Sequence, residues 1–413
     1  MSHNTLTRHA LAAAAMVVSA GLTTAGAQRP SPAPEGVIDT IVRFAATDGT
    51  PLEAKLSIPA GVESPVPVAF YLHGAGPRNF DHPVRFRASD GTIQQTRYYD
   101  YYARELARHG LGFFRMSKRG CTVGDDGRSA VDRAVFSQAT STVMLQDYAA
   151  ALEVLRRRAD VDGQRIVLLG SSEGTRLAPQ LARRSPDGVA GLVLMSHQPD
   201  NLRNTVVWQN SAGAWRAVSS LIPEAADDAL TRAEYDEAVK RDASLTTRLP
   251  FPAVDTDSNG VATSAELTAL IRPRLDAILK AVEDRNDDFI WQSLLNLTSA
   301  YLLDGWDAEP TQTFLLPLAM PIGIFHGELD GTTRVEGARE TEAAFRAAGK
   351  SNLTVRTYPG LDHDLGWTPP AAGLGPEPFQ DAFRFAAELV RARKSAMVRS
   401  STSGWSNMMN RRD

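Results

Sequence analysis

The sequence predicts an α/β protein with a mostly parallel sheet that is covered by helices on both faces. Strand-like runs alternate with helical segments along most of the chain, and these runs are apolar at nearly every position, as in strands buried on both sides. The chain has 413 residues, of which 43% are hydrophobic and 22% charged, and this is sufficient for a large core.

The N-terminal residues have the pattern of a secretory signal peptide. Arg8 precedes a run of small and apolar residues from 10 to 27, and Ala25-Gly26-Ala27 fits the small-x-small cleavage rule. We expect residues 1–27 to be removed and the protein to be periplasmic or secreted. The alternative, a membrane anchor, requires a longer uninterrupted apolar run, and we expect no membrane span after signal removal.

The predicted elements follow in order. Residues 38–61 form two alternating strands around Asp48-Gly49, which is a hairpin signal and supplies an antiparallel edge. Strands are then predicted within 66–77, 111–120, 165–174, 189–198, 320–330 and 353–363, and helices within 98–110, 142–158, 175–185, 334–349 and 378–393. The core therefore divides into residues 28–200 and 317–395, with a helical insertion over 201–316 and a loose polar tail over 396–413.

Ligands of such sheets collect at the carboxyl ends of the strands, and one strand here ends in "GSSEG". A G-x-S-x-G sequence between a strand and a helix forms a sharp turn that exposes its middle serine, here Ser172. The backbone N–H of Glu173 then lies at a helix N-terminus, where the helix dipole favours an oxyanion. Ser172 is the predicted nucleophile; an ordinary tight turn is the alternative.

A serine nucleophile needs a base, and the base needs a carboxylate that orients it. Of the eight histidines, His363 lies just beyond the final predicted strand, between Gly360 and Gly366. Asp330 follows the preceding strand, and Asp304 is a weaker alternative. Ser172, Asp330 and His363 are therefore the predicted catalytic triad.

With these motifs the chain resembles the α/β-hydrolase superfamily. The segments "HGAGP", "RMSKRG", "GSSEG", "HGELD" and "GLDH" occur in the expected order between about Gly36 and Arg393. Among its branches, the chain is similar to bacterial esterases and acyl-peptidase-like hydrolases. The resemblance implies a second oxyanion donor from the backbone of Gly74 or Ala75, and no cofactor for catalysis. One departure lies in the turn after "RMSK", where the family usually reads "RG.G" and this chain has Arg119-Gly120-Cys121.

The insertion carries apolar residues in the positions where family members commonly have a lid. These residues are Ile290, Trp291, Leu294, Leu295, Tyr301 and Leu302. They could face a substrate or simply pack against the main domain, and the sequence does not separate the two interpretations.

Residues 255–266 of the insertion match an EF-hand calcium loop. Asp255, Asp257 and Asn259 occupy positions 1, 3 and 5, Gly260 makes the turn at position 6, and Glu266 closes the loop at position 12. The remaining ligand positions, 7 and 9, are Val261 and Thr263. Pro250 and Pro252 interrupt the helix that should enter the loop. Residues 223–234 match the later part of a second loop whose early positions lack ligands. We expect a structural calcium ion in the lid; the alternative is a turn without metal.

These patterns predict an exported serine hydrolase that cleaves carboxylic esters through an acyl-enzyme. A peptidase or amidase with the same triad is the first alternative, so the expected substrate is a small-molecule ester or a short peptide. A calcium-dependent binding protein on an inactive hydrolase scaffold is the second. The formal net charge of −4 gives no support for a nucleic-acid partner.

Overall fold

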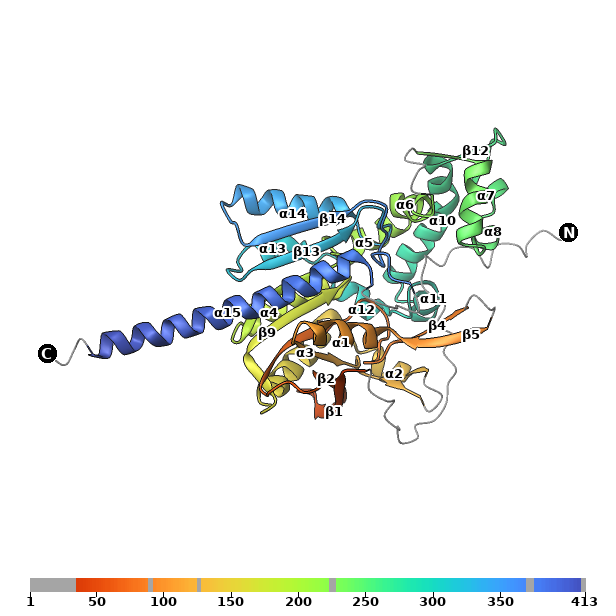
Figure 1. The fold of residues 1–413 in the computed structure, drawn as a ribbon. Coiled ribbons are helices and arrows are strands. Elements are labelled where there is room, and N and C mark those ends of the chain that lie inside the picture. Colours follow the sequence, from red (N-terminus) through yellow and green to blue (C-terminus); the bar gives the residue numbers. More distant parts are fainter. Residues whose placement is uncertain (1–34, 88–91, 125–127, 223–227, 369–374, 410–413) are drawn as a thin grey trace.

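The computed structural model describes residues 35–87, 92–124, 128–222, 228–368 and 375–409. The predicted signal peptide, residues 1–27, lies outside the described residues. An eight-stranded sheet forms the centre of the molecule, in the order β1-β2-β6-β3-β9-β10-β13-β14 (Figure 1). Its strands are β1 (Val37–Ala45), β2 (Pro51–Pro59), β3 (Val66–Leu72), β6 (Gly112–Met116), β9 (Val161–Ser171), β10 (Val189–Met195), β13 (Ile322–Gly327) and β14 (Leu353–Tyr358).

The sheet is parallel from β6 to β14 and antiparallel only at one edge. There β1 and β2 form the hairpin predicted around Asp48-Gly49, with Val37 opposite Pro59 and Ala45 opposite Pro51. Gly49 has a φ of +84°, a left-handed conformation that glycine adopts without steric cost. β2 then pairs antiparallel with β6. The predicted fold class is therefore confirmed.

The alternation of side chains along β3 shows why two hydrophobic layers form. Val68, Phe70 and Leu72 belong to one buried cluster, whereas Ala69 and Tyr71 belong to another on the opposite face of the sheet. Because successive side chains of a strand point to opposite faces, an uninterrupted apolar strand requires a cover on each side.

Helices supply both covers. The first cluster contains side chains of α3 (Ser141–Arg156), α4 (Gly174–Arg184) and α14 (Val335–Ala347). The second contains side chains of α1 (Tyr98–Arg108) and α15 (Glu377–Met409). The short α2 (Arg133–Phe136) and the two-stranded ladders β4 (Pro83–Arg87) with β5 (Ile93–Arg97) and β7 (Cys121–Val123) with β8 (Ser129–Val131) lie in the connections.

The prediction of a loose tail from residue 396 was wrong, because α15 continues through Met409 and projects from the body of the molecule (Figure 1). No proline or glycine occurs between 396 and 403 to end the helix. None of the helices in the described parts of the chain combines the length and apolar character needed to cross a bilayer.

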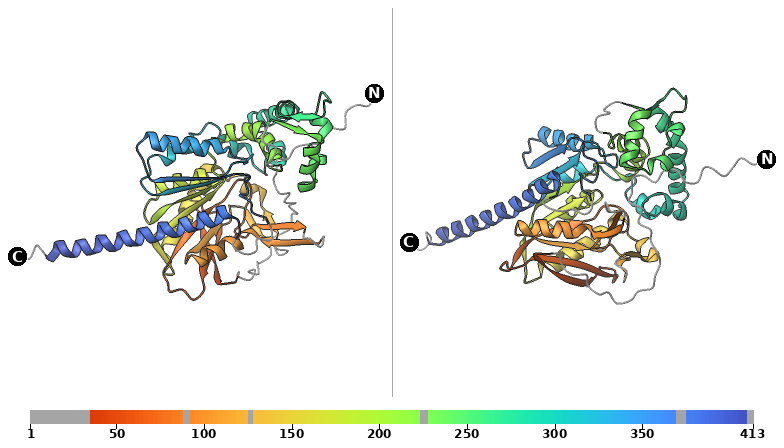
Figure 2. Two further views of the ribbon diagram at one scale, coloured as in Figure 1. Left: turned by 45° about the horizontal axis from the view of Figure 1, so that its top comes forward. Right: turned by 45° about the vertical axis from the view of Figure 1, so that its right-hand side comes forward.

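The segment between β10 and β13 lies to one side of the sheet (Figure 2). It holds α5 (Leu202–Gln209), α6 (Ala212–Ser219), β11 (Ala229–Thr231), α7 (Arg232–Arg241), α8 (Leu245–Arg248), α9 (Phe251–Val254), β12 (Val261–Thr263), α10 (Ser264–Glu283), α11 (Asp287–Ser293), α12 (Ser299–Asp304) and α13 (Thr311–Leu315). Residues from α6 to the first half of α10 have a small hydrophobic core of their own.

Candidate active site

Ser172 lies in a tight turn between β9 and α4, with a φ of +53°. Its flanking glycines are required by the close approach of backbone atoms. A Cβ atom on Gly174 would lie 2.0 Å from the carbonyl oxygen of Leu72, and one on Gly170 would lie 2.5 Å from that of Gly174. The positive φ of Ser172 is a strained conformation, because the residue has a side chain. It is held by a turn in which only glycine fits at positions 170 and 174.

The "HGAG" loop that follows β3 lies against this turn. A Cβ atom built on Gly74 would lie 3.3 Å from Ser172 Cβ and 3.8 Å from Ser172 Oγ. Glu173 directly precedes α4, where the first amide groups of a helix have no partner within the helix. The backbone of Gly74 and the start of α4 therefore both lie next to Ser172.

Asp330 follows β13 and is fully buried. Its Oδ1 accepts hydrogen bonds from the amides of Thr332 at 2.7 Å and Thr333 at 2.8 Å, and its Oδ2 accepts one from the Thr333 hydroxyl at 2.8 Å. Burial alone would raise the pKa of this carboxyl, but the neighbouring imidazoles of His363 and His326 lower it well below its ordinary value. The carboxylate is therefore held ionised in a fixed orientation.

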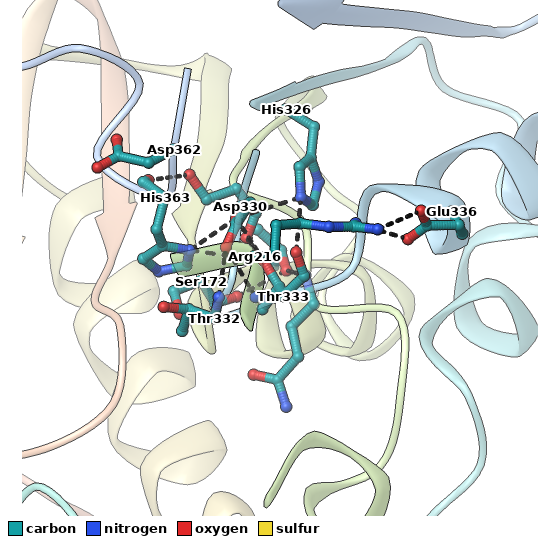
Figure 3. Close-up of polar contacts among 12 residues, drawn as sticks. Ser172, Arg216, His326, Asp330, Thr332, Thr333, Glu336, Asp362 and His363 are labelled. Atoms are coloured by element: carbon teal, nitrogen blue, oxygen red, sulfur yellow. Dashed lines mark hydrogen bonds and ion pairs between the residues drawn. The ribbon is translucent and has the colours of Figure 1, made fainter. Parts of the chain in front are cut away.

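His363 lies in the loop after β14, and its Nδ1 is 2.8 Å from Asp330 Oδ2 (Figure 3). Its backbone carbonyl accepts a hydrogen bond from the Ser196 hydroxyl at 2.6 Å. Burial would lower the pKa of the imidazole, but the charge and hydrogen bond of Asp330 raise it to about 9. An Nδ1 proton shared with Asp330 leaves Nε2 as the nitrogen that can accept a proton.

Ser172 and His363 approach each other because their strand ends are neighbours. The Ser172 amide donates to the Met195 carbonyl at 3.0 Å, and Ser196, the next residue of that strand end, holds the His363 carbonyl. Figure 3 shows the serine beside the imidazole. Among the described contacts, no hydrogen bond joins the hydroxyl to the ring. Such bonds are often long before substrate binds.

Comparison with known proteins agrees with this architecture. Residues 95–370 match the family model described as the alpha/beta hydrolase fold. The chain belongs to the α/β-hydrolase fold family. It is also similar to esterase EstD of Thermotoga maritima, with 30% identity over 140 residues, a match that covers 33% of this chain and 29% of that esterase. The chain thus spans less than a third of the length of this curated relative.

Several solved structures resemble this hydrolase-fold protein. A hypothetical protein from Pseudomonas aeruginosa is 15% identical with a TM-score of 0.48, over 87% of this chain and 95% of that chain. Brefeldin A esterase, a bacterial homologue of human hormone-sensitive lipase, is 18% identical with a TM-score of 0.44, over 89% and 81%. A thermostable esterase from Pseudomonas putida is 18% identical with a TM-score of 0.43, over 86% and 83%.

Asp304, the weaker alternative to Asp330, and two other titratable residues, Cys121 and His73, have other roles in this hydrolase fold. Asp304 accepts hydrogen bonds from the amide and hydroxyl of Thr142 at 2.7 Å and 2.9 Å, so it binds the start of α3. Cys121 is buried, and burial raises the pKa of its thiol to about 12, which suppresses the thiolate. His73 is fully buried, and burial together with the charge of Lys118 lowers its pKa to about 3.

Sequence reasoning missed His326, whose Nε2 lies 3.2 Å from Asp330 Oδ2 and 3.1 Å from the Thr333 carbonyl. It also missed Ser196 and Thr333 as the residues that hold His363 and Asp330. The spacing of His326 and Asp330 within "HGELD" was the one available signal. The contact of Ser196 with His363 joins residues far apart in the chain and has no local pattern.

The apolar residues of the insertion pack mainly against the main domain. Ile290, Leu294, Tyr301 and Leu302 are buried in the same cluster as α3 and α4, and Trp291 packs on it. Leu295 is 38% exposed. Of the two interpretations left open by the sequence, the structure favours packing for these residues.

The predicted calcium loop brings three carboxylates together. Oxygen atoms of Asp255, Asp257 and Glu266 lie within 4.8 Å of one another. The Asn259 Oδ1 accepts a hydrogen bond from the Val261 amide at 2.8 Å. Hydrogen bonds from the hydroxyls of Thr263 and Thr256 lower the pKa of Glu266 to about 2, so this side chain is ionised at neutral pH.

The two loop-like segments pair as a short antiparallel ladder, β11 with β12. Leu230, at position 8 of the first segment, lies opposite Ala262, at position 8 of the second. Residues 223–227, which hold the early positions of the first loop, lie outside the described residues. The entering helix before Asp255 is the short α9, which begins after Pro250. Pro250 therefore limits this helix to a single turn, whereas Pro252 lies within its first turn and does not interrupt it.

Proposed function

We propose that this protein is an exported serine hydrolase that cleaves carboxylic esters. The observation that carries the proposal is the 2.8 Å contact between His363 Nδ1 and buried Asp330, at the strand ends beside the strained turn of Ser172. Membership of the α/β-hydrolase fold family supports the reaction class. Export rests on the signal-peptide pattern of residues 1–27.

The mechanism follows from the protonation states. Neutral His363 accepts the proton of Ser172 at Nε2 while Oγ forms a bond to the ester carbonyl carbon. The oxyanion is stabilised by backbone N–H groups of Glu173 and of the Gly74–Ala75 segment. Collapse breaks the bond to the alkoxy oxygen, which takes the proton from Nε2 and leaves as the alcohol.

Water then completes the reaction. It attacks the acyl carbon of the Ser172 ester and gives a proton to Nε2, and collapse of the second tetrahedral intermediate returns this proton to Ser172 as the carboxylic acid leaves. Asp330 stays ionised throughout, because its two amide donors and one hydroxyl donor all stabilise the carboxylate form. Its charge offsets the cation that forms on His363.

A panel of chromogenic esters and aminoacyl amides, assayed with the wild type and with Ser172→Ala, tests the proposal. We expect ester turnover that the alanine variant loses. Turnover of amides with little ester hydrolysis would favour a peptidase or amidase. A folded wild type that neither turns over a substrate nor reacts with a fluorophosphonate would instead support a calcium-dependent binding protein on an inactive scaffold.

We also propose that residues 255–266 bind one structural calcium ion. Asp255, Asp257 and Glu266 supply carboxylate oxygens, with Asn259, the Val261 carbonyl and Thr263 at the remaining positions. The pairing of Leu230 with Ala262 supports this interpretation, because it joins the two loop-like segments at matching positions. Calorimetric titration with calcium tests it: Asp257→Asn should weaken or abolish the binding heat, and no heat from the wild type at millimolar calcium would refute it.

A further inference from the structure

A buried cluster of Lys118, Glu173 and Tyr301 lies beside the nucleophile and is not used by the mechanism above. Lys118 and Glu173 form an ion pair with an N–O distance of 2.8 Å, and each side chain is only 2% exposed. The Tyr301 hydroxyl donates to the other carboxylate oxygen of Glu173 at 2.5 Å. An ion pair so buried is costly to desolvate, and its net effect on stability is often small, so another role is worth testing.

The topology explains how the three residues meet. Lys118 follows the end of β6, the "HGAG" loop follows β3, and Glu173 follows β9, and these strands are neighbours in the sheet. Tyr301 comes from α12 in the insertion. The cluster therefore joins the insertion to the "HGAG" loop and to Glu173, the two segments that supply the proposed oxyanion donors.

Lys118 also donates a hydrogen bond to the carbonyl oxygen of Gly74, with a distance of 2.7 Å. The C=O and N–H of a trans peptide point in opposite directions. A carbonyl of Gly74 that is held by Lys118 therefore directs the N–H of Ala75 away from Lys118. Among the described hydrogen bonds, none uses that N–H as donor.

We infer that Lys118 is a positioning residue for the oxyanion site. It fixes the Gly74–Ala75 peptide so that the Ala75 N–H is available to the oxyanion, and Glu173 and Tyr301 hold the Lys118 ammonium in place. The inference rests on the proposed hydrolase function. It also selects Ala75 over Gly74 as the second donor, a choice that the sequence left open.

The test compares Lys118→Met and the double variant Lys118→Met/Glu173→Gln with Arg119→Met as the matched control. Arg119 is the next residue and forms a similarly buried ion pair with Asp147, with both side chains 2% exposed, and a second one with the half-exposed Asp48. None of its described hydrogen bonds reaches Gly74. The double variant removes both charges, so it avoids the unpaired carboxylate that the single variant leaves and that could prevent folding.

For both Lys118 variants we expect kcat to fall by about 10–100-fold with KM changed by less than about threefold, somewhat less than the loss of a whole oxyanion donor. Inhibition constants for a trifluoromethyl ketone, which forms an oxyanion adduct on the serine, should rise by a similar factor. Arg119→Met should lower the urea midpoint but leave both quantities within about twofold of the wild type.

A double variant with wild-type kcat and inhibition would overturn the inference, as would equal losses in Arg119→Met. Those outcomes leave the wild-type hydrolase activity intact, so they are distinct from failure of the proposed function. A wild type without turnover and without fluorophosphonate labelling would overturn both.

Discussion

Replacement of Asp330 by asparagine tests the proposed triad most directly, because the structure dictates which way the new amide points. The two backbone amides of Thr332 and Thr333 donate to Oδ1. In Asp330→Asn the amide oxygen must remain there, since an NH2 group would face two donors. The NH2 group then faces His363 Nδ1, which must act as acceptor, so the imidazole proton moves to Nε2. This tautomer cannot accept the proton of Ser172.

The size of the pKa change also follows from the structure. The pKa of His363 is raised from 6.5 to about 9 by Asp330 against the opposing effect of burial. The difference corresponds to about 3 kcal/mol. Without the carboxylate, the lowering effect of burial is opposed by the charges of Asp364 and Asp362 alone, so the pKa of His363 in the variant should fall below about 9.

The assay is the pH dependence of kcat/KM for a chromogenic ester. Neutral His363 is the active form, so the wild-type value should rise with pH to an inflection near 9. In Asp330→Asn the inflection should move to a lower pH than in the wild type, and kcat should fall by about 10³–10⁴-fold. Asp304→Asn is the control for the substitution, and it should change neither the pH of the inflection nor kcat. An unchanged inflection in the Asp330 variant would refute the assigned role.

The contact between His363 and Asp330 should also make the free energy of unfolding depend on pH in a defined direction. The raised pKa of His363 contributes stability that is complete below pH 6.5 and is lost as the pH rises through about 9. The lowered pKa of Asp330 contributes stability that is present above pH 3.8 and is lost as the pH falls. The difference in free energy of unfolding between wild type and Asp330→Asn should therefore be largest between about pH 4 and 6.5. A difference that grows between pH 6.5 and 9 would contradict this assignment.

Three further predictions concern the nucleophile, its turn and a buried ion pair outside the site. Ser172→Ala should lower ester turnover by at least about 10⁴-fold and abolish fluorophosphonate labelling with an unchanged melting temperature; residual labelling would place the nucleophile elsewhere. Gly174→Ala should cost about 4 kcal/mol or more in urea unfolding, because its Cβ would lie 2.0 Å from the Leu72 carbonyl oxygen, and wild-type stability would show that the turn can relax. Asp147→Asn should cost about 2–3 kcal/mol, because it leaves the buried Arg119 paired only with Asp48, whose side chain is 48% exposed; a loss below about 1 kcal/mol would mean that Asp48 and water suffice for this guanidinium.

The local features of the fold were predictable because their causes are local. Apolar runs of strand length identify the buried strands, and Gly49 marks the hairpin turn. The glycines around Ser172 relieve crowding between backbone atoms that are close in any turn of this kind. The tail after residue 396 was mispredicted because the end of a helix without an apolar face leaves little trace in the sequence.

The order of strands, and everything that depends on it, was decided by the tertiary structure. The side chains that stand at strand ends could be read from the sequence, because apolar runs of strand length and glycine turns are properties of short segments. The sequence did not determine that β6, β3 and β9 would be adjacent, so neither the contact of Lys118 with Gly74 nor that of Tyr301 with Glu173 could be foreseen. Such contacts form between residues distant in the chain, and only burial of the whole sheet brings them within hydrogen-bonding distance.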